Sequence, residues 1–521
     1  MLTSVHSQDQ TAAVRLVELL SDRSAWHRSL WGIGTVLAMA EMVEACAAMR
    51  QGHLSEAALK RMGSTLQKRS GQHPAFSDDE KHFLRQQLQQ VPRPDSAAHY
   101  GIRELGERLS SDYLQRWGRV VALGSHGAEH FARSVASHLL DAGFTQHHVR
   151  ALVKQQLDAD QPISLADLCE ILHAEACNSP LRDFDVLVAF SAPPLFRNAA
   201  PPGWLQGVAV MEWLKEHHFD TGGVRAPAAV LLKVRARDTM GAAQAAREES
   251  DRYAARMLLA TSRPLRRLPS LWIKGADAPI PLEDASRGVL VKELYREDRV
   301  FRGDANPSVE AALELLAHLE GSSAPAAVAG GWGAIEGLLA DPSDRASAAD
   351  NLATLVTCSY PRAELTRLSY RVQPELMQAW DRFDGPHANR LRCRELARHI
   401  ADDTLAEPLS LTDRAAVIRM QKVLNDPRPQ LQVVRDAIGD SLHRLYRQRN
   451  LILHGARLDS VALSASLRTV SKLVGAGMDR ITHGQYVQNV KPLELVAKAN
   501  LALALINRDS ALGCVDLLES A

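Results

Sequence analysis

Residues 438–455 read IGDSLHRLYRQRNLILHG, and this stretch predicts a long amphipathic helix near the C-terminus of the chain. Its apolar residues recur at the three- and four-residue intervals that place side chains on one helical face: Ile438, Leu442, Leu445 and Ile452. Arg449 takes a position of that apolar stripe where a leucine is expected. A charged side chain on a packed face needs a partner or a ligand. Arg449 is therefore the first candidate functional residue.

Asn450 and His454 complete a polar group around Arg449. They lie four residues apart, so a helix places their side chains on one face, and Gly455 is expected to end that helix. A histidine can carry the proton of a ribose 2′-hydroxyl or of a leaving oxygen near neutral pH, and an arginine can hold the charge that builds on a phosphate. The group favours RNA cleavage without a metal. The alternative is an arginine that reaches solvent from a packed helix, beside a capping histidine.

The spacing of Arg449 and His454 has little weight by itself. With 20 histidines and many arginines, the same separation arises by chance, as at the pairs Arg133 and His138, Arg382 and His387, and Arg394 and His399. The apolar stripe around Arg449 is what distinguishes it from these.

A second apolar stripe interrupted by a charge lies upstream, in residues 332–339, WGAIEGLL. One acid falls on its packed face, within the series Trp332, Ile335, Glu336 and Leu339. Two packed faces that each contain one opposite charge suggest a buried or half-buried pair. We expect Glu336 to pack near Arg449 or His454 and to orient them. The alternative is a solvated Glu336 at the edge of its stripe.

The two segments together resemble the HEPN superfamily, in particular its ApeA-like branch, which is linked to anti-phage defence. That family carries an Arg, four to six residues and then a His, with a polar residue after the Arg; here these are Arg449, His454 and Asn450. Residues 332–339 resemble the early HEPN helix, in which a Trp and a Glu lie among apolar residues. The resemblance covers about residues 305–515 and does not extend to the first 300.

The resemblance implies a metal-independent endoribonuclease without a cofactor. HEPN enzymes typically pair two bundles so that two copies of the motif face each other, which implies a homodimer. His454 would act as general acid or base, Arg449 would hold the phosphate and Asn450 would donate a hydrogen bond. The expected products are a 2′,3′-cyclic phosphate and a 5′-hydroxyl end.

Single-stranded RNA or RNA loops, tRNA anticodon loops included, are the expected substrates, because a paired A-form groove hides its bases. By analogy, the chain would be a toxin or anti-phage effector whose N-terminal half senses infection or restrains the nuclease, with a phage- or operon-encoded protein as partner. The alternative is a catalytically inactive HEPN-type scaffold that binds RNA or protein.

The charge balance limits how RNA is bound. Lys+Arg and Asp+Glu are both 61, which argues against a protein that coats nucleic acid through bulk electrostatics. A local basic groove is compatible with this balance. Candidate RNA-binding residues are Arg390, Arg392, Arg394 and Arg444, and Arg447 is a candidate supporting residue. Such charge runs are also common on solvated helix faces.

Other site types and compartments find little support. His173 and Glu175, with Cys177 nearby, are similar to the His-x-Glu motif of zinc deaminases, but no Pro-Cys-x-x-Cys segment follows them. Walker, dinucleotide-binding, nucleophile-elbow and His-Glu-x-x-His motifs are absent from the sequence.

Six scattered cysteines indicate reduced thiols, and we see no signal-peptide pattern. The apolar run 31–49 contains two glutamates, so it predicts a core helix and no membrane span. The expected compartment is the cytoplasm.

The predicted fold is mainly α with a small α+β middle region and a C-terminal HEPN-like helix bundle. Three regions are expected: a helical N-terminal region (1–182), a small α+β domain (183–304) and a HEPN-like helical domain (305–521). Strands are predicted over 183–190, 229–236 and 270–273, with a helix over 242–259. Periodicity leaves residues 208–214 undecided between strand and helix. From 307 onward the pattern is a series of helices with short connections.

Overall fold

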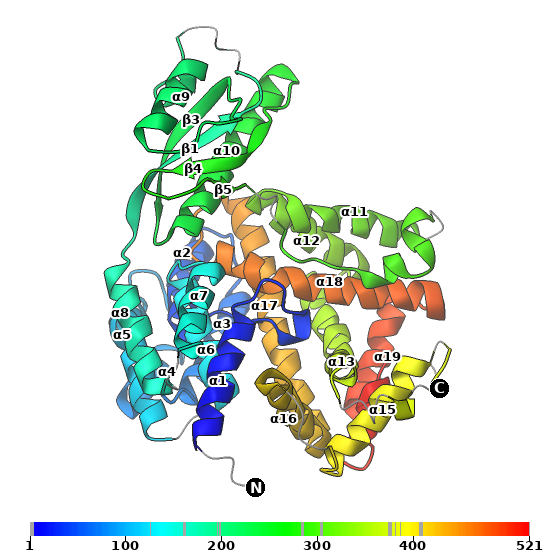
Figure 1. Ribbon diagram of the computed structural model, residues 1–521. Helices are drawn as coiled ribbons and strands as arrows, with labels where there is room; N and C mark the ends of the chain where they lie inside the picture. The colour runs from blue at the N-terminus through cyan, green and yellow to red at the C-terminus, as the bar shows by residue number, and fades with distance from the viewer. Residues whose placement is uncertain are drawn as a thin grey trace. The chain divides into compact units, whose positions relative to one another are not determined.

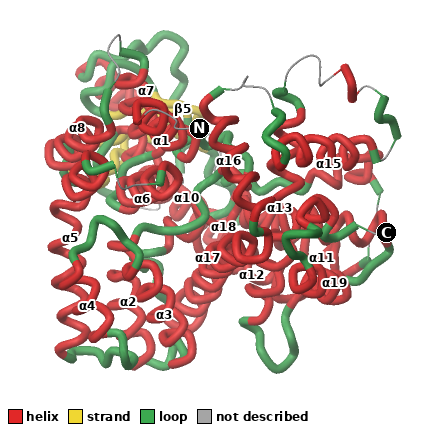
Figure 2. Tube along the Cα trace, turned by 90° about the horizontal axis from the view of Figure 1, so that it is seen from below, coloured by secondary structure: helices red, strands yellow, loops and turns green. Residues whose placement is uncertain are grey.

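A computed structural model describes residues 5–124, 127–159, 163–194, 196, 199–282, 286–302, 306–372, 378–380, 382–385, 387–405 and 410–519. The described chain is mainly helical with one small antiparallel sheet, which confirms the predicted mainly α fold with a small α+β region (Figures 1 and 2). By its contacts it divides into two compact units. Unit 1 contains residues 1–138, 153–170 and 286–521, and unit 2 contains residues 139–152 and 171–285. The three-part division stays a prediction, and its boundary at 304/305 lies outside the described residues.

Unit 2 is built around a five-stranded sheet of order β2-β3-β1-β4-β5. Its elements are β1 (Arg182–Phe190), β2 (Trp204–Gln206), α9 (Gly207–Glu216), β3 (Ala228–Ala236), α10 (Thr239–Thr261), β4 (Arg267–Ile273) and β5 (Ile280–Pro281). Side chains of β1 alternate between the faces: Val186 and Val188 pack in the core shared with α10, and Leu187 and Ala189 in the core that contains α9 (Figure 1). The three predicted strands are confirmed, and the undecided residues 208–214 form helix α9.

The N-terminal helices are α1 (Val5–Leu19), the 3₁₀ turn η1 (Trp26–Arg28), α2 (Thr35–Arg50), α3 (Glu56–Gly71), α4 (Asp78–Gln87), α5 (Ala97–Ala122), α6 (Ala128–Asp141), α7 (Gln146–Leu157) and α8 (Leu165–Asn178). The predicted helical character of residues 1–182 is therefore confirmed where the chain is described. Helix α2 contains most of the apolar run 31–49. No helix among the described residues has both the length and the apolar character required to span a bilayer.

The C-terminal helices are α11 (Pro307–Gly321), α12 (Ala324–Leu339), α13 (Ser347–Ser369), α15 (Ala388–Ala401), α16 (Leu411–Asn425), α17 (Pro427–Gly455), α18 (Leu463–Gln488) and α19 (Pro492–Leu505), with the 3₁₀ segments η2 (Lys292–Phe301) and η3 (Ala511–Asp516). The apolar stripe of α17 is buried in the core that these helices share, at Ile438, Leu442, Leu445 and Ile452. A close helix approach occurs at Gly477 of α18, where a Cβ would collide with the Leu352 side chain of α13.

Helix α17 ends one residue later than predicted. Gly455 is still helical, and Ala456 adopts the left-handed conformation at φ 48° that ends the helix. The neighbouring His53 explains why a glycine is needed before it, since a Cβ at position 455 would lie 2.8 Å from the His53 ring.

Buried ion pairs join the N-terminal and C-terminal helices of unit 1. The Arg28 Nε donates to Glu364 Oε1 at 2.5 Å, and its Nη1 donates to Asp413 Oδ1 at 3.2 Å. The three side chains are at most 3% exposed. A buried charge that loses its partner is strongly destabilising, so the two groups of helices depend on each other.

Candidate active site

The C-terminal end of α17 brings Arg449, Asn450 and His454 into contact. Arg449 Nη1 donates to Asn450 Oδ1 at 3.0 Å and lies 3.1 Å from His454 Nε2. A guanidinium has donors and no acceptor, so His454 Nε2 must accept in this contact. Nε2 can then accept from another donor whenever Arg449 moves away, as a base for a hydroxyl proton must.

Glu336 of α12 lies next to this group. Its Oε2 is 4.0 Å from Arg449 Nη2, at the outer limit of an ion pair, and its Oε1 is 3.3 Å from Arg345 Nη1. The Glu336 and Arg449 side chains are 18% and 17% exposed, so both are largely buried but still reach solvent. The proximity predicted for Glu336 is therefore present in the structure, although its shorter ion pair goes to Arg345.

An aromatic pair fixes the register of α12 against α17. The rings of Trp332 and Tyr446 lie 4.8 Å apart, and Trp332 is buried in the shared core. Glu336 follows Trp332 by four residues and Arg449 follows Tyr446 by three, which is about one helical turn in each case. The packed rings thus place the charged residues of the two helices at the same level.

The His454 end of the site is open to solvent. His454 is exposed, and apolar side chains near it in sequence are also exposed: Leu453 (53%), Leu458 (57%) and Val461 (48%). The segment after α17 is held by Glu44 of α2, which accepts from the Arg457 guanidinium at 3.0 Å and the Ser460 hydroxyl at 2.7 Å. An exposed imidazole beside a partly buried arginine can meet a phosphodiester that approaches from solvent.

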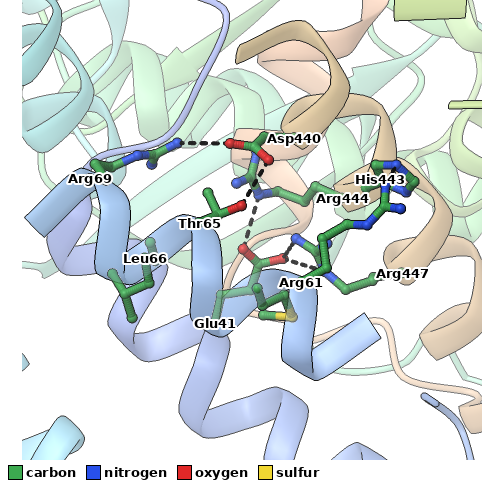
Figure 3. Close-up of a pocket in the computed structure, with 11 residues that line it drawn as sticks. Glu41, Arg61, Thr65, Leu66, Arg69, Asp440, His443, Arg444 and Arg447 are labelled. Atoms are coloured by element: carbon green, nitrogen blue, oxygen red, sulfur yellow. Dashed lines mark hydrogen bonds and ion pairs between the residues drawn. The ribbon is translucent and has the colours of Figure 1, made fainter. Parts of the chain in front are cut away.

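Two predicted residues face elsewhere. Arg444 and Arg447 both donate to Glu41 of α2, at 3.0 and 2.8 Å (Figure 3). Burial raises the pKa of Glu41, but attraction from the two arginines outweighs it and brings this pKa to about 2. Because Arg444 and Arg447 are buried in that ion pair, the predictions that Arg444 binds RNA and that Arg447 supports the site do not fit the structure. They lie on the side of α17 that packs against the N-terminal helices.

The three arginines of α15 are also engaged within the chain. Arg390 and Arg394 both pair with the Asp516 carboxylate of η3, and Arg392 donates to the Tyr370 hydroxyl at 2.7 Å. Of the two arginines that pair with Asp516, Arg394 is the more exposed to solvent, at 42%. No contact in the described structure joins this group to Arg449 or His454, so a continuous RNA groove that includes all of them stays a prediction.

The repeated Arg-His spacing gives a comparison within the chain. In α15, Arg394 pairs with Asp516, while the His399 ring contacts the Thr404 hydroxyl at 2.9 Å. The same sequence separation therefore gives different geometry: the two side chains meet in α17 and have other partners in α15.

Comparisons with protein-family models, with curated proteins and with solved structures find no match. The resemblance to HEPN proteins therefore rests on the residues of α12 and α17 described above. In the described part of the chain, no three His, Cys, Asp or Glu side chains are grouped so as to hold a metal ion.

Sequence reasoning missed two features of this region. Arg345, which pairs with Glu336 and is 67% exposed, lies in a short acidic loop after α12, where no periodicity identifies it. Glu41 was a detectable signal, because it interrupts an apolar run and so requires a buried partner. Its partner could not be named from the sequence, since Arg444 is 403 residues away.

Proposed function

We propose that this chain is an endoribonuclease that cleaves single-stranded or loop RNA without a metal, at a site formed by Arg449, Asn450 and His454. The observation that carries the proposal is the contact between Arg449 Nη1 and His454 Nε2 at an exposed helix end. This contact supports the proposal because a guanidinium and an imidazole that lie this close together could act on one phosphodiester.

The proposed reaction begins when an RNA phosphate draws Arg449 away from His454. The freed His454 Nε2 takes the proton of the ribose 2′-hydroxyl, and the 2′-oxygen forms a bond to phosphorus while the bond to the 5′-oxygen breaks. The leaving 5′-oxygen takes a proton from a second imidazole that is in its protonated, imidazolium form, so that one ring gains a proton and the other loses one. The products are a 2′,3′-cyclic phosphate and a 5′-hydroxyl end, and Arg449 holds the charge that develops on the phosphate.

A second copy of the chain would supply the second imidazole. The exposed Leu453, Leu458 and Val461 provide apolar surface around His454 for such a contact, and a two-fold dimer would bring two copies of His454 into one cleft. Free thiols are common in reducing compartments, and all six cysteines are unpaired here. We therefore propose action in the cytoplasm, and by the resemblance a role as a defence effector.

The test is cleavage of single-stranded RNA in the presence of EDTA. We expect chelator-resistant cleavage that falls at least about 100-fold in His454→Ala, since general acid-base catalysis contributes roughly that factor. Arg449→Ala should lose about 100-fold or more through the phosphate charge. The matched control is His399→Ala, which removes a histidine with the same Arg spacing and should leave cleavage unchanged. Absence of cleavage by the wild type, or equal cleavage by His454→Ala, would contradict the proposal.

The second candidate function is a scaffold that binds RNA or protein without cleaving it. The exposed apolar residues beside His454 favour it, because they would also suit a protein partner. RNA binding that is equal in the wild type and in His454→Ala, with cleavage in neither, would support this function over the nuclease.

A further inference from the structure

A cavity of about 520 Å³ lies within unit 1, and none of the candidate active-site residues lines it. Its walls come from α1, residues 30–35, the start of α6, α16 and the first half of α17. Small-molecule sites in proteins typically have volumes of about 300 to 1,000 Å³. The cavity is thus large enough for a ligand, and its lining determines which kind.

The lining carries an excess of positive charge. Its carboxylate is Glu129, and its cationic side chains are Arg15, Arg69, Arg133, Arg419 and Lys422. Burial lowers the pKa of the two lining histidines, that of His73 to about 3. Both rings are therefore neutral at neutral pH, and the net charge of the lining is set by the five cations and Glu129.

Glu129 is shared among three arginines. Its Oε1 accepts from Arg15 Nη2 at 2.9 Å and from Arg133 Nε at 2.7 Å, while Arg419 Nη1 lies 3.4 Å from its Oε2. Burial raises the pKa of Glu129, but attraction from these arginines holds it well below its usual value. One ionised carboxylate cannot neutralise three guanidinium groups.

Three of the five cations have further carboxylates. Arg15 also pairs with Glu18, Arg419 pairs with Glu364, and Arg69 Nη2 lies 3.7 Å from Asp440 Oδ2. Among the described residues, the one other hydrogen bond of Arg133 is a long contact of 3.4 Å to a backbone carbonyl.

Lys422 adds a cation to the cavity wall; it is exposed and pairs with no described carboxylate. Arg133 shares Glu129, its one carboxylate among the described residues, with two other arginines. The wall formed by Arg133, Arg419 and Lys422 therefore favours an anion.

The rest of the lining is apolar and aromatic. The Arg133 guanidinium lies over the Trp31 ring, 4.6 Å from its centre, so a charged group and an aromatic ring are in direct contact on this wall. Further lining residues are Leu30, Ile33, Ile418, Val433 and Val434. Such a wall favours a ligand that has an apolar, flat part next to its anionic group.

We propose that this cavity binds a small organic phosphate, with the phosphate on Arg133, Arg419 and Lys422 and a flat apolar group against Trp31 and its neighbours. Guanidinium groups bind phosphate oxygens through paired N–H donors, and a lysine adds a compact charge. The proposal is independent of RNA cleavage, because it concerns different residues.

The test is calorimetric titration of the full chain with 1-naphthyl phosphate and with AMP. We expect at least one of them to bind with a Kd below 1 mM, and at least about tenfold more tightly than 1-naphthol, adenosine or inorganic phosphate. Lys422→Glu should weaken binding at least tenfold, since it reverses one charge at an exposed position. Ser134→Trp, which adds an indole to the cavity lining, should abolish binding. The matched control is Lys491→Glu, an exposed lysine outside the cavity, which should bind as the wild type does.

Several results would overturn the proposal. The first is that neither 1-naphthyl phosphate nor AMP binds with a Kd below 1 mM. The second is that binding is unchanged in both Lys422→Glu and Ser134→Trp. The third is that Lys491→Glu weakens binding as much as Lys422→Glu does. Binding of 1-naphthol, adenosine or inorganic phosphate that is as tight as binding of the organic phosphates would also overturn it. The cavity would then not need a phosphate and a flat apolar group in the same ligand. The far-UV circular dichroism and urea midpoint of each variant show that it is folded.

Discussion

Removal of the Glu41 carboxylate should destabilise unit 1 strongly. Glu41, Arg444 and Arg447 have side chains that are 5%, 4% and 8% exposed, so all three charges are withdrawn from water. Glu41→Gln keeps the shape of the side chain but leaves two buried guanidinium groups without a counter-charge. Breaking a buried ion pair by removing one partner costs about 3 to 5 kcal/mol, and we expect a loss of unfolding free energy of that size.

The assay is urea unfolding at pH 7, followed by tryptophan fluorescence and by hydrogen exchange of amides in α2 and α17. Glu56→Gln is the matched control: Glu56 pairs with Lys60, but both side chains are more than 60% exposed, so no measurable change is expected. The triple variant Glu41→Leu, Arg444→Leu, Arg447→Met should recover most of the loss, because an apolar replacement of a whole buried cluster is often neutral or stabilising.

The pH dependence of the same variant follows from the lowered pKa of Glu41. A carboxyl group whose pKa is about 2 in the folded state and about 4.5 when unfolded contributes stability above pH 4.5 that is lost as the pH falls toward 2. The difference between wild type and Glu41→Gln should therefore shrink below pH 4.5. A Glu41→Gln variant within 1 kcal/mol of wild type at pH 7 would refute the reasoning, since the arginines would then not depend on this carboxylate.

Three other predictions test the packing and the site. His27 is buried with a pKa lowered to about 3 by burial, so the unfolded chain gains a proton below about pH 6.5 while the folded chain does not. Stability should fall between pH 6.5 and 3, and His27→Phe should reduce that loss by about 2 kcal/mol between pH 6.5 and 4.5 in urea titrations; equal pH slopes would contradict this. Gly477→Ala should cost about 1 to 3 kcal/mol because its Cβ meets Leu352, whereas Gly337→Ala, which meets nothing within 4 Å, should be neutral or slightly stabilising by thermal unfolding. Glu336→Gln should slow RNA cleavage about tenfold if it orients Arg449, and an unchanged rate would assign Glu336 to Arg345 alone.

The elements that repeat an intact pattern over many residues were predictable from the sequence. Helix α17 follows an apolar stripe that the structure buries, and β1 and β3 follow runs of apolar residues. Strands β2 and β5, with three and two residues, are too short to show a period. They exist because a neighbouring strand offers hydrogen bonds, which is information from the tertiary fold.

The candidate site, too, was only partly predictable from the sequence. Glu336 could be predicted beside Arg449 because each interrupts an apolar stripe and the two carry opposite charges. Arg444 was predicted to bind RNA and Arg447 to support the site, because the run of arginines that ends at Arg449 could line a basic groove. Their counter-charge comes from Glu41, and no local pattern can identify a partner on so distant a helix. The cavity around Glu129 is likewise formed by helices that meet only in the folded chain.

The Arg28 guanidinium limits how this chain can be shortened. A truncation that keeps residues 305–521 would delete Arg28 and leave Glu364, which is fully buried, with one remaining guanidinium, that of Arg419. Such a fragment would also expose the apolar side chains that Trp31 covers. The C-terminal helices are thus not a module that can be excised, because their buried charges and apolar core are completed by residues from the start of the chain.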